Sequence, residues 1–107
     1  MVTIRGCFRY IWDIIRLVVC CDIPFKFIYR YIKRDLDFPH PIGVVMGDRV
    51  KVGRNVIIYQ NVTLGSLRSG NEEFPTIKDN VKIYAGAVVV GNVVIEKDVC
   101  ANALIKP

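Results

Sequence analysis

Histidine is nearly absent from this chain of 107 residues, since His40 is the only one. The spacing of the other residues suggests no Ser-His-Asp or Cys-His arrangement, and no P-loop for phosphate is present. The four cysteines lack the paired C-x-x-C spacing of a zinc site. We therefore expect no metal centre, and we interpret the cysteines as reduced thiols in a cytosolic protein.

Long apolar runs are also lacking, although 52% of the residues are hydrophobic. The nearest candidate is a stretch with helical spacing from about residue 8 to 21, and Pro24 limits this helix near Ile23. It is too short to span a bilayer, and Asp13 and Arg16 interrupt it. No small-residue cleavage site follows, so the stretch does not qualify as a secretory signal peptide.

What the chain does have is a sixfold repeat of apolar residues in two rows. The first row is Val44, Val50, Val56, Val62, Val81, Ala87, Val93, Val99 and Ile105, and the second is Met46, Val52, Ile58, Leu64, Ile83, Val89, Ile95 and Ala101. Helices repeat at about 3.6 residues and flat strands at about 2, so neither explains this period. Short strands separated by corners do, with both rows facing inward. The repeat predicts an all-β solenoid, with an ordinary antiparallel domain as the less favoured alternative.

Glycine and asparagine stand where the corners of such a solenoid belong, because both tolerate turn conformations. They are Gly47, Gly53, Gly65, Gly91, Asn55, Asn61, Asn80 and Asn92. The repeat stops between Gly65 and Pro75, and this polar stretch predicts a loop at 66–75 that protrudes from one corner. Such loops commonly carry function, and this one is placed to cover a site or to contact a neighbouring subunit.

Acidic residues are scarce at the beginning of the chain. Residues 1–34 carry seven basic residues against two acidic ones, whereas eight of each balance in residues 35–107. We therefore divide the chain into a basic, aromatic helical segment at 1–34 and a solenoid at 35–107. The segment either caps the solenoid or lies on an anionic membrane surface. No recognition motif accompanies the charge, so nucleic acid is not an expected partner.

Three blocks of the solenoid resemble one family. They are residues 39–47 (PHPIGVVMG), residues 58–65 (IYQNVTLG), and residues 75–77 with 85–87 (PTI and AGA). Together they strongly resemble the serine acetyltransferases, which are hexapeptide-repeat acyltransferases. The resemblance implies a left-handed parallel β-helix that forms a homotrimer. It also implies an O-acetyltransferase that moves an acetyl group from acetyl-CoA to a hydroxyl.

The same resemblance implies that His40 is the general base, which removes the hydroxyl proton during attack on the thioester carbonyl. The transfer is expected to be direct, without an acyl-enzyme and without a metal. A carboxylate upstream of the histidine should orient the imidazole. Asp22 is the candidate for this role, and Asp35 and Asp37 are alternatives.

Acetyl-CoA is expected, by resemblance, in a groove between neighbouring subunits. Main-chain groups at corners made of small residues line that groove in the family. Gly65 and Ser66 match one of these corners, and Ala85 and Gly86 match the next. Small side chains let the thin pantetheine arm approach the backbone, although glycine and alanine also simply make corners.

Two positions depart from the family pattern and bear on the acceptor. Serine acetyltransferases usually carry Arg-His where this chain has Glu73 and Phe74. Glu73 repels the carboxylate of free serine, whereas Phe74 offers an apolar face to a sugar ring. We therefore predict substrate contacts at Glu73 and Phe74 and slightly favour a saccharide hydroxyl, with L-serine as the alternative.

The C-terminal end suggests a further alternative. The sequence stops at Pro107 inside the last coil, whereas relatives continue with another strand and a tail. A truncated trimeric relative with weak or no activity is therefore also considered. We expect a cytoplasmic protein, with the inner membrane surface as an alternative location.

Overall fold

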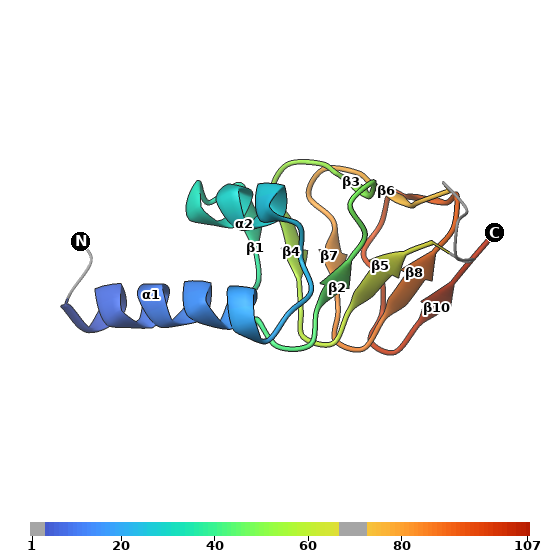
Figure 1. Ribbon diagram of the computed structural model, residues 1–107. Coiled ribbons are helices and arrows are strands. Elements are labelled where there is room, and N and C mark those ends of the chain that lie inside the picture. The colour runs from blue at the N-terminus through green and yellow to red at the C-terminus, as the bar shows by residue number, and fades with distance from the viewer. Residues whose placement is uncertain (1–3, 67–72) are drawn as a thin grey trace.

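The computed structural model describes residues 4–66 and 73–107. The loop predicted at 66–75 falls largely on residues 67–72, which lie outside the described part. Two helices, α1 (Ile4–Val19) and α2 (Phe25–Ile32), stand at one end of the molecule, and short strands form the rest (Figure 1). Within the described residues no helix is long and apolar enough to cross a membrane.

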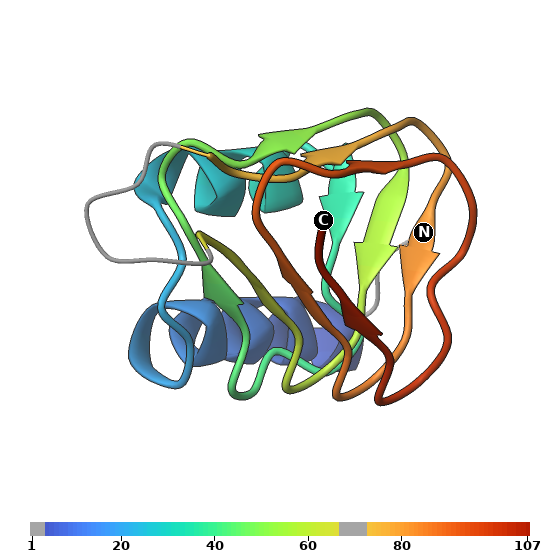
Figure 2. The same cartoon turned by 90° about the vertical axis from the view of Figure 1, so that its right-hand side faces the viewer.

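The strands pair in parallel and form three sheets. They are β1 (Leu36–Asp37), β2 (Val45–Met46), β3 (Lys51–Val52), β4 (Val56–Ile58), β5 (Thr63–Gly65), β6 (Thr76–Ile77), β7 (Lys82–Ile83), β8 (Val88–Val90), β9 (Val94–Ile95) and β10 (Leu104–Ile105). Sheet A has the order β10-β8-β5-β2, sheet B the order β1-β4-β7, and sheet C the order β3-β6-β9. From β2 to β9, successive strands pass from A to C to B and return to A; in the last coil an isolated bridge of Val99 with Ile83 takes the place of a strand in sheet B. The end view in Figure 2 shows this three-sided path, which agrees with the predicted solenoid of parallel strands.

The two predicted apolar rows form most of the core. Thirteen of their seventeen members are buried, and Val52, Val93 and Ile105 are half-buried. Both rows face inward because residues two apart on a strand share a side. Phe38 and Leu17 close the core at the end covered by the helices, where both are completely buried.

The prediction that Ala101 faces inward is wrong, because the register shifts in the last coil. Ile83 pairs with Val99, 16 residues further on, whereas Thr76 pairs with Val94, 18 residues further on. A shift by two keeps the same side facing inward, so Val99 remains buried. The same shift moves Ala101 out of the second row into a corner turn, where it is exposed.

One corner, between sheets B and A, repeats the same left-handed conformation in every coil. We call it the A/B corner, and its residues are Gly43 (φ 67°), Asn61 (φ 59°), Gly86 (φ 77°) and Asn102 (φ 60°). A Cβ at Gly43 would lie 2.2 Å from Asn61 Oδ1, and one at Gly86 would lie 2.2 Å from Asn102 Oδ1. Each asparagine therefore needs a glycine in the coil before it.

The predicted corner glycines serve different purposes. Among them Gly91 has a positive φ, as do the predicted corner residues Asn55, Asn61 and Asn80. Gly47 and Gly65 do not have a positive φ, and they mark the opposite end of sheet A, which we call the A/C corner. At Gly47 the absence of a side chain leaves room for the ring of Phe74, because a Cβ there would lie 2.4 Å from Phe74 Cε1.

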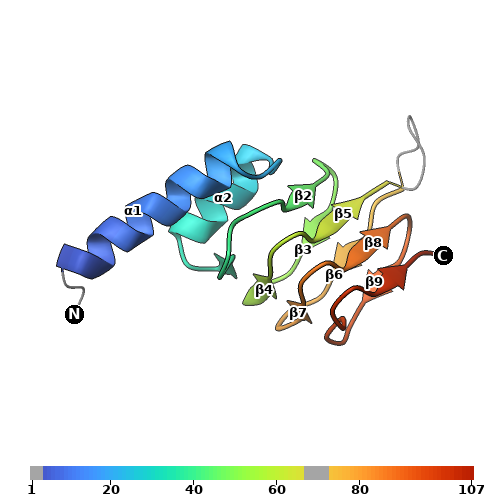
Figure 3. The ribbon, with the colours of Figure 1, turned by 90° about the horizontal axis from the view of Figure 1, so that it is seen from below.

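The helices α1 and α2 lie side by side at the end of the solenoid (Figure 3). The rings of Tyr10 and Tyr31 stack between them at 5.7 Å, and Tyr31 also contacts Phe38 at 5.9 Å. Helix α2, which is only eight residues long, was not predicted. The prediction that Pro24 limits the first helix near Ile23 is wrong, because α1 already ends at Val19. Pro24 is instead the N-cap residue of α2, where its missing N–H costs no hydrogen bond of the helix.

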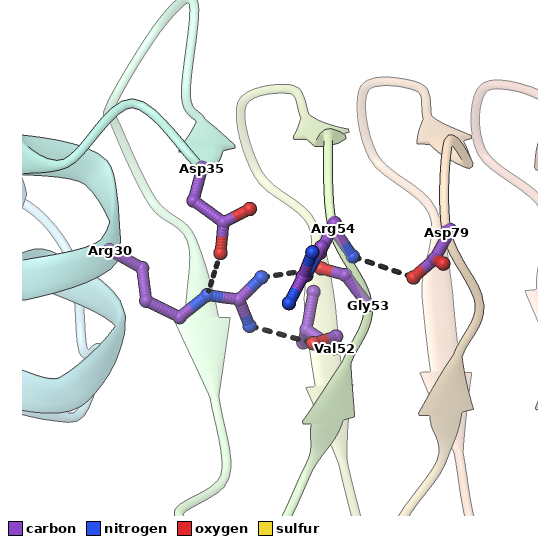
Figure 4. Close-up of polar contacts among 6 residues, drawn as sticks. All are labelled: Arg30, Asp35, Val52, Gly53, Arg54 and Asp79. Atoms are coloured by element: carbon purple, nitrogen blue, oxygen red, sulfur yellow. Dashed lines mark hydrogen bonds and ion pairs between the residues drawn. The ribbon is translucent and has the colours of Figure 1, made fainter.

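Arg30 of α2 ties the helical end to the first coil (Figure 4). Its guanidinium donates to the Asp35 carboxylate at 2.9 Å and to the carbonyl of Val52 at 2.7 Å, and also to the carbonyl of Gly53. Val52 ends β3, which is an edge strand of sheet C, and Gly53 follows it. The half-buried side chain of Arg30 thus joins α2 to the first coil.

Candidate functional site

His40 stands on a bulge at the A/B corner. Strand β1 pairs with β4 at a spacing of 20 residues, whereas β2 pairs with β5 at a spacing of 18. The first coil therefore has two extra residues where it turns from sheet B to sheet A. Pro39 and Pro41 flank His40 there; Pro41 is buried and His40 is exposed. Two prolines restrict the backbone on both sides of the imidazole, so the bulge presents it to solvent in a defined place.

Asp22 lies at the free edge of sheet A, where it pairs with Val45. Its N–H donates to the carbonyl of Val44, and its carbonyl accepts from the N–H of Met46, both at 2.9 Å. Paired residues of parallel strands point to the same side, so the Asp22 carboxylate shares the outer face of the sheet with Val45. Within the described residues, no side-chain hydrogen bond joins it to His40.

The two alternative carboxylates differ in their surroundings. Asp35 forms its ion pair with Arg30 at 2.9 Å. Asp37 lines a hollow of about 320 Å³ at the helical end, together with Tyr10 and Tyr31. Burial, with the nearby Asp13 and Asp37 carboxylates, raises the pKa of Tyr31 to about 12. Asp22 and Asp37 are both exposed, whereas Asp35 is held by Arg30.

Among residues 4–66 and 73–107, no group of three or more His, Cys, Asp or Glu side chains could hold a metal ion. Cys20, Cys21 and Cys100 are free thiols. Burial raises the pKa of the Cys21 thiol, which makes it a poor nucleophile at neutral pH.

Glu73 and Phe74 lie at the A/C corner, at the other end of sheet A. They line a hollow of about 620 Å³ with Lys26, Asp48, Arg49, Val50, Lys51, Thr76 and Asn92. The ammonium of Lys26, which begins on α2, donates to the carbonyl of Asp48. The hollow is thus built from α2 and from three successive coils.

The positive side of this hollow was not predicted, because Glu73 alone suggested a negative corner. Its lining includes Lys26, Arg49 and Lys51 beside the carboxylates of Asp48 and Glu73. The lining residues are up to 66 positions apart in the chain, and the insertion at 66–75 hides the pairing of Lys51 with Thr76. The charge of the corner is therefore mixed, with three cationic and two anionic side chains.

The residues predicted to bind CoA divide between the two corners. Ala85 and Gly86 lie at the A/B corner with His40, whereas Gly65 and Ser66 lie at the A/C corner. Gly86 is required by the fold, as shown above. A Cβ added at Gly65, in contrast, would meet no atom of the described residues within 4 Å. The fold does not explain that glycine, and the open backbone beside it fits the approach of a pantetheine arm.

The two groups do not meet within one chain. Gly43 and Gly47 mark the two ends of β2, and four residues at about 3.3 Å each separate them by roughly 13 Å. His40 therefore lies at one end of sheet A, and Phe74 lies at the other.

Gln60 adds a feature at the A/B corner that the sequence analysis did not single out. Its side-chain Oε1 is buried, and it lacks a hydrogen-bond partner among the described residues. It directly precedes Asn61, whose N–H donates to the carbonyl of Ile42 at 2.9 Å. A buried polar atom of this kind usually has a partner, so a donor from outside the chain fits here.

Comparison with known proteins confirms the resemblance that the sequence blocks indicated. The chain matches no protein-family model. Serine acetyltransferases of Staphylococcus xylosus and Staphylococcus aureus (strain Mu50) are 46% and 45% identical over 73 residues, which are 67% of this chain and 34% of those proteins. The crystal structure of native serine acetyltransferase 1 from Entamoeba histolytica is 31% identical with a TM-score of 0.51, covering 67% of this chain and 34% of that one. The chain thus spans about a third of the length of the curated relatives it matches.

Proposed function

We propose, from the homology of this chain to serine acetyltransferases of the hexapeptide-repeat family, that it transfers an acetyl group from acetyl-CoA to the hydroxyl of L-serine. The observation that carries the proposal is the exposed His40 on its proline-flanked bulge, inside the region of 46% identity. We also infer that the three-sided coil has the left hand expected from this family.

His40 acts as the general base in this proposal. Its imidazole takes the proton of the serine hydroxyl while the oxygen attacks the thioester carbonyl carbon. The new C–O ester bond forms, the C–S bond breaks, and the imidazolium returns the proton to the departing sulfur. Asp22 is the positioning residue, which stabilises the imidazolium through the other ring nitrogen. No acyl-enzyme and no oxidant are needed.

The acceptor is where the sequence and the comparisons differ. The sequence favoured a saccharide slightly, whereas the names of the relatives support L-serine. The hollow at the A/C corner also supports L-serine, because the exposed Lys51 lines it and offers a cationic partner for its carboxylate. A saccharide hydroxyl is the second candidate, favoured by the ring of Phe74 in the same hollow.

The separation of the two corners supports a site shared between subunits. We propose a homotrimer in which the A/B corner of one subunit, with His40, faces the A/C corner of the next, with Gly65 and Phe74. Acetyl-CoA would lie in the groove between them, with Gly65, Ser66, Ala85 and Gly86 along its walls. A neighbouring subunit or the bound molecule would also supply the donor that Gln60 Oε1 lacks.

The proposal is tested by measuring the release of CoA thiol from acetyl-CoA, with L-serine in one series and a panel of sugars in another. We expect release with L-serine and a loss of roughly 10²-fold or more in His40→Ala. Lys97→Ala, another exposed position on the solenoid, is the matched control and should keep full turnover.

Different results point to different errors. Release with sugars alone would move the acceptor to a saccharide. A folded His40→Ala variant with full activity would overturn the mechanism, and sedimentation as a monomer would count against the shared groove. No release with any acceptor would favour the inactive relative.

A further inference from the structure

Helix α1 has two apolar sides, and the solenoid uses only one of them. Leu17 is completely buried against the core, with Tyr10 and Ile14 packed beside it. The opposite side also carries large apolar residues, and these are exposed: Ile11, Trp12, Ile15, Val18 and Val19. Their spacing of three, four and seven residues makes one continuous stripe along the helix.

The exposure of this stripe is large for a water-facing surface. Trp12 is 59% exposed, Val18 60% and Val19 74%. Helix α2 adds Phe25 and Tyr29 to the exposed apolar residues of the same helical end. Contiguous apolar patches on soluble domains usually mark an interaction surface.

The segment that carries the stripe has an excess of basic residues. Residues 1–34 carry seven basic and two acidic residues. Two of the basic residues lie on the α2 side of α1: the Arg34 guanidinium stands 5.7 Å from the ring of Tyr10, and the Lys33 ammonium stands 5.0 Å from the ring of Tyr29 on α2. Both residues are exposed, unlike Arg30, whose guanidinium is used inside the fold. The occupant of this surface should therefore be apolar in part and negatively charged in part.

These charges decide between a second copy and a lipid surface. A second copy of α1 would bring the same excess of positive charge against itself, which disfavours that pairing. An anionic bilayer offers hydrocarbon to the stripe and negative headgroups to the arginines and lysines. Trp12 also suits the boundary between headgroups and acyl chains.

We propose that the exposed stripe of α1 lies on an anionic membrane surface, to which the excess of basic residues in the segment 1–34 is attracted. The helix has 16 residues, about 24 Å, and it lies in the interface rather than across it. Its C-terminal end is held to the solenoid, because the carbonyl of Cys20 accepts from the N–H of Gly43 at 2.9 Å. Membrane binding therefore brings the A/B corner, three residues from His40, close to the lipid surface.

The test is sedimentation of the full chain with vesicles, one set of phosphatidylcholine alone and one of equimolar phosphatidylcholine and phosphatidylglycerol. We expect binding to the anionic vesicles only, with weaker binding at higher salt. Trp12 is the only tryptophan, so its emission should shift to the blue when the vesicles are added. The double variant Ile15→Ser with Val18→Ser should weaken binding roughly tenfold or more.

Leu104→Ser is the matched control, because Leu104 is 64% exposed on sheet A, away from the helices. It should bind vesicles like the parent protein. Circular dichroism should show both variants folded, since none of these side chains is buried. The proposal is overturned if the folded parent does not bind anionic vesicles, or if the double variant binds as tightly as the control. It is also overturned if the double variant lowers the assembly size without vesicles, which would identify a second copy as the occupant. None of these readouts depends on acetyl transfer.

Discussion

Gly65 and Gly86 lie at opposite ends of sheet A and should respond in opposite ways to an added side chain. Gly86 has a φ of 77°, and a Cβ there would lie 2.2 Å from Asn102 Oδ1. Gly65 has no positive φ, and a Cβ there would lie more than 4 Å from every atom in the described part of the chain. The perturbation we consider is therefore Gly65→Val, with Gly86→Ala as its comparison.

The magnitudes follow from these surroundings. A left-handed conformation costs a side chain about 1–2 kcal/mol, and Asn102 must also move, so Gly86→Ala should lower the free energy of unfolding by about 1–3 kcal/mol. Glycine inside a strand is itself unfavourable by about 0.5–1 kcal/mol, so Gly65→Val should leave that free energy unchanged or raise it slightly. The valine methyl groups would occupy the open backbone at the proposed groove. We expect acetyl-CoA affinity to fall about tenfold or more, which corresponds to about 1.4 kcal/mol.

Urea unfolding measures the free energy of unfolding of both variants, and isothermal titration calorimetry measures their affinity for acetyl-CoA. The combination is the informative result: Gly65→Val should be as stable as the parent and bind poorly. If Gly65→Val binds acetyl-CoA as the parent does, Gly65 does not line the groove. If it loses as much stability as Gly86→Ala, the open space beside Gly65 has been misjudged.

Two further predictions concern the helical end. Replacing Arg30 with Leu removes its hydrogen bonds to Asp35 and to the carbonyls of Val52 and Gly53. The change should lower the free energy of unfolding, measured in urea titrations, by roughly 1.5–3 kcal/mol. An unchanged unfolding midpoint would mean that α2 is held by its apolar face alone. The raised pKa of Tyr31, about 12 against an unfolded value of 10, means that the unfolded chain loses this proton first. The stabilisation should be complete below about pH 10 and lost as pH rises to about 12, by up to roughly 2–3 kcal/mol. Tyr31→Phe should remove this part of the alkaline loss, and an identical pH profile in both proteins would contradict it.

The general architecture was accessible from the sequence because the period of six is a local property. Each short strand buries residues two apart, and this requirement repeats in every coil whatever lies beside it. The positions that need a left-handed backbone were partly accessible too, as Asn55, Asn61 and Asn80 show. His40 stood out because it is the only histidine and has a proline on each side.

The position of α2 and the register of the last coil depend on how distant segments of the chain are aligned. A repeat that is local in the sequence carries no information about that alignment. Helix α2 is too short for its spacing to stand out, and its position depends on Arg30 reaching the corner carbonyls of Val52 and Gly53. The two-residue shift that exposes Ala101 depends on which strand the last coil pairs with.

What the sequence determined by itself is the repeating coil, because an inward apolar pair on each short strand is needed in every turn. What only the tertiary structure decided is how the predicted site residues are distributed. Corners that are close in sequence lie at opposite ends of sheet A, and Lys26 reaches the hollow of Glu73 and Phe74 from a helix 47 positions away. The physical reason is that a solenoid stacks residues that are one coil apart in sequence. A strand, in contrast, keeps the residues at its two ends apart, although they are only a few positions from each other in sequence.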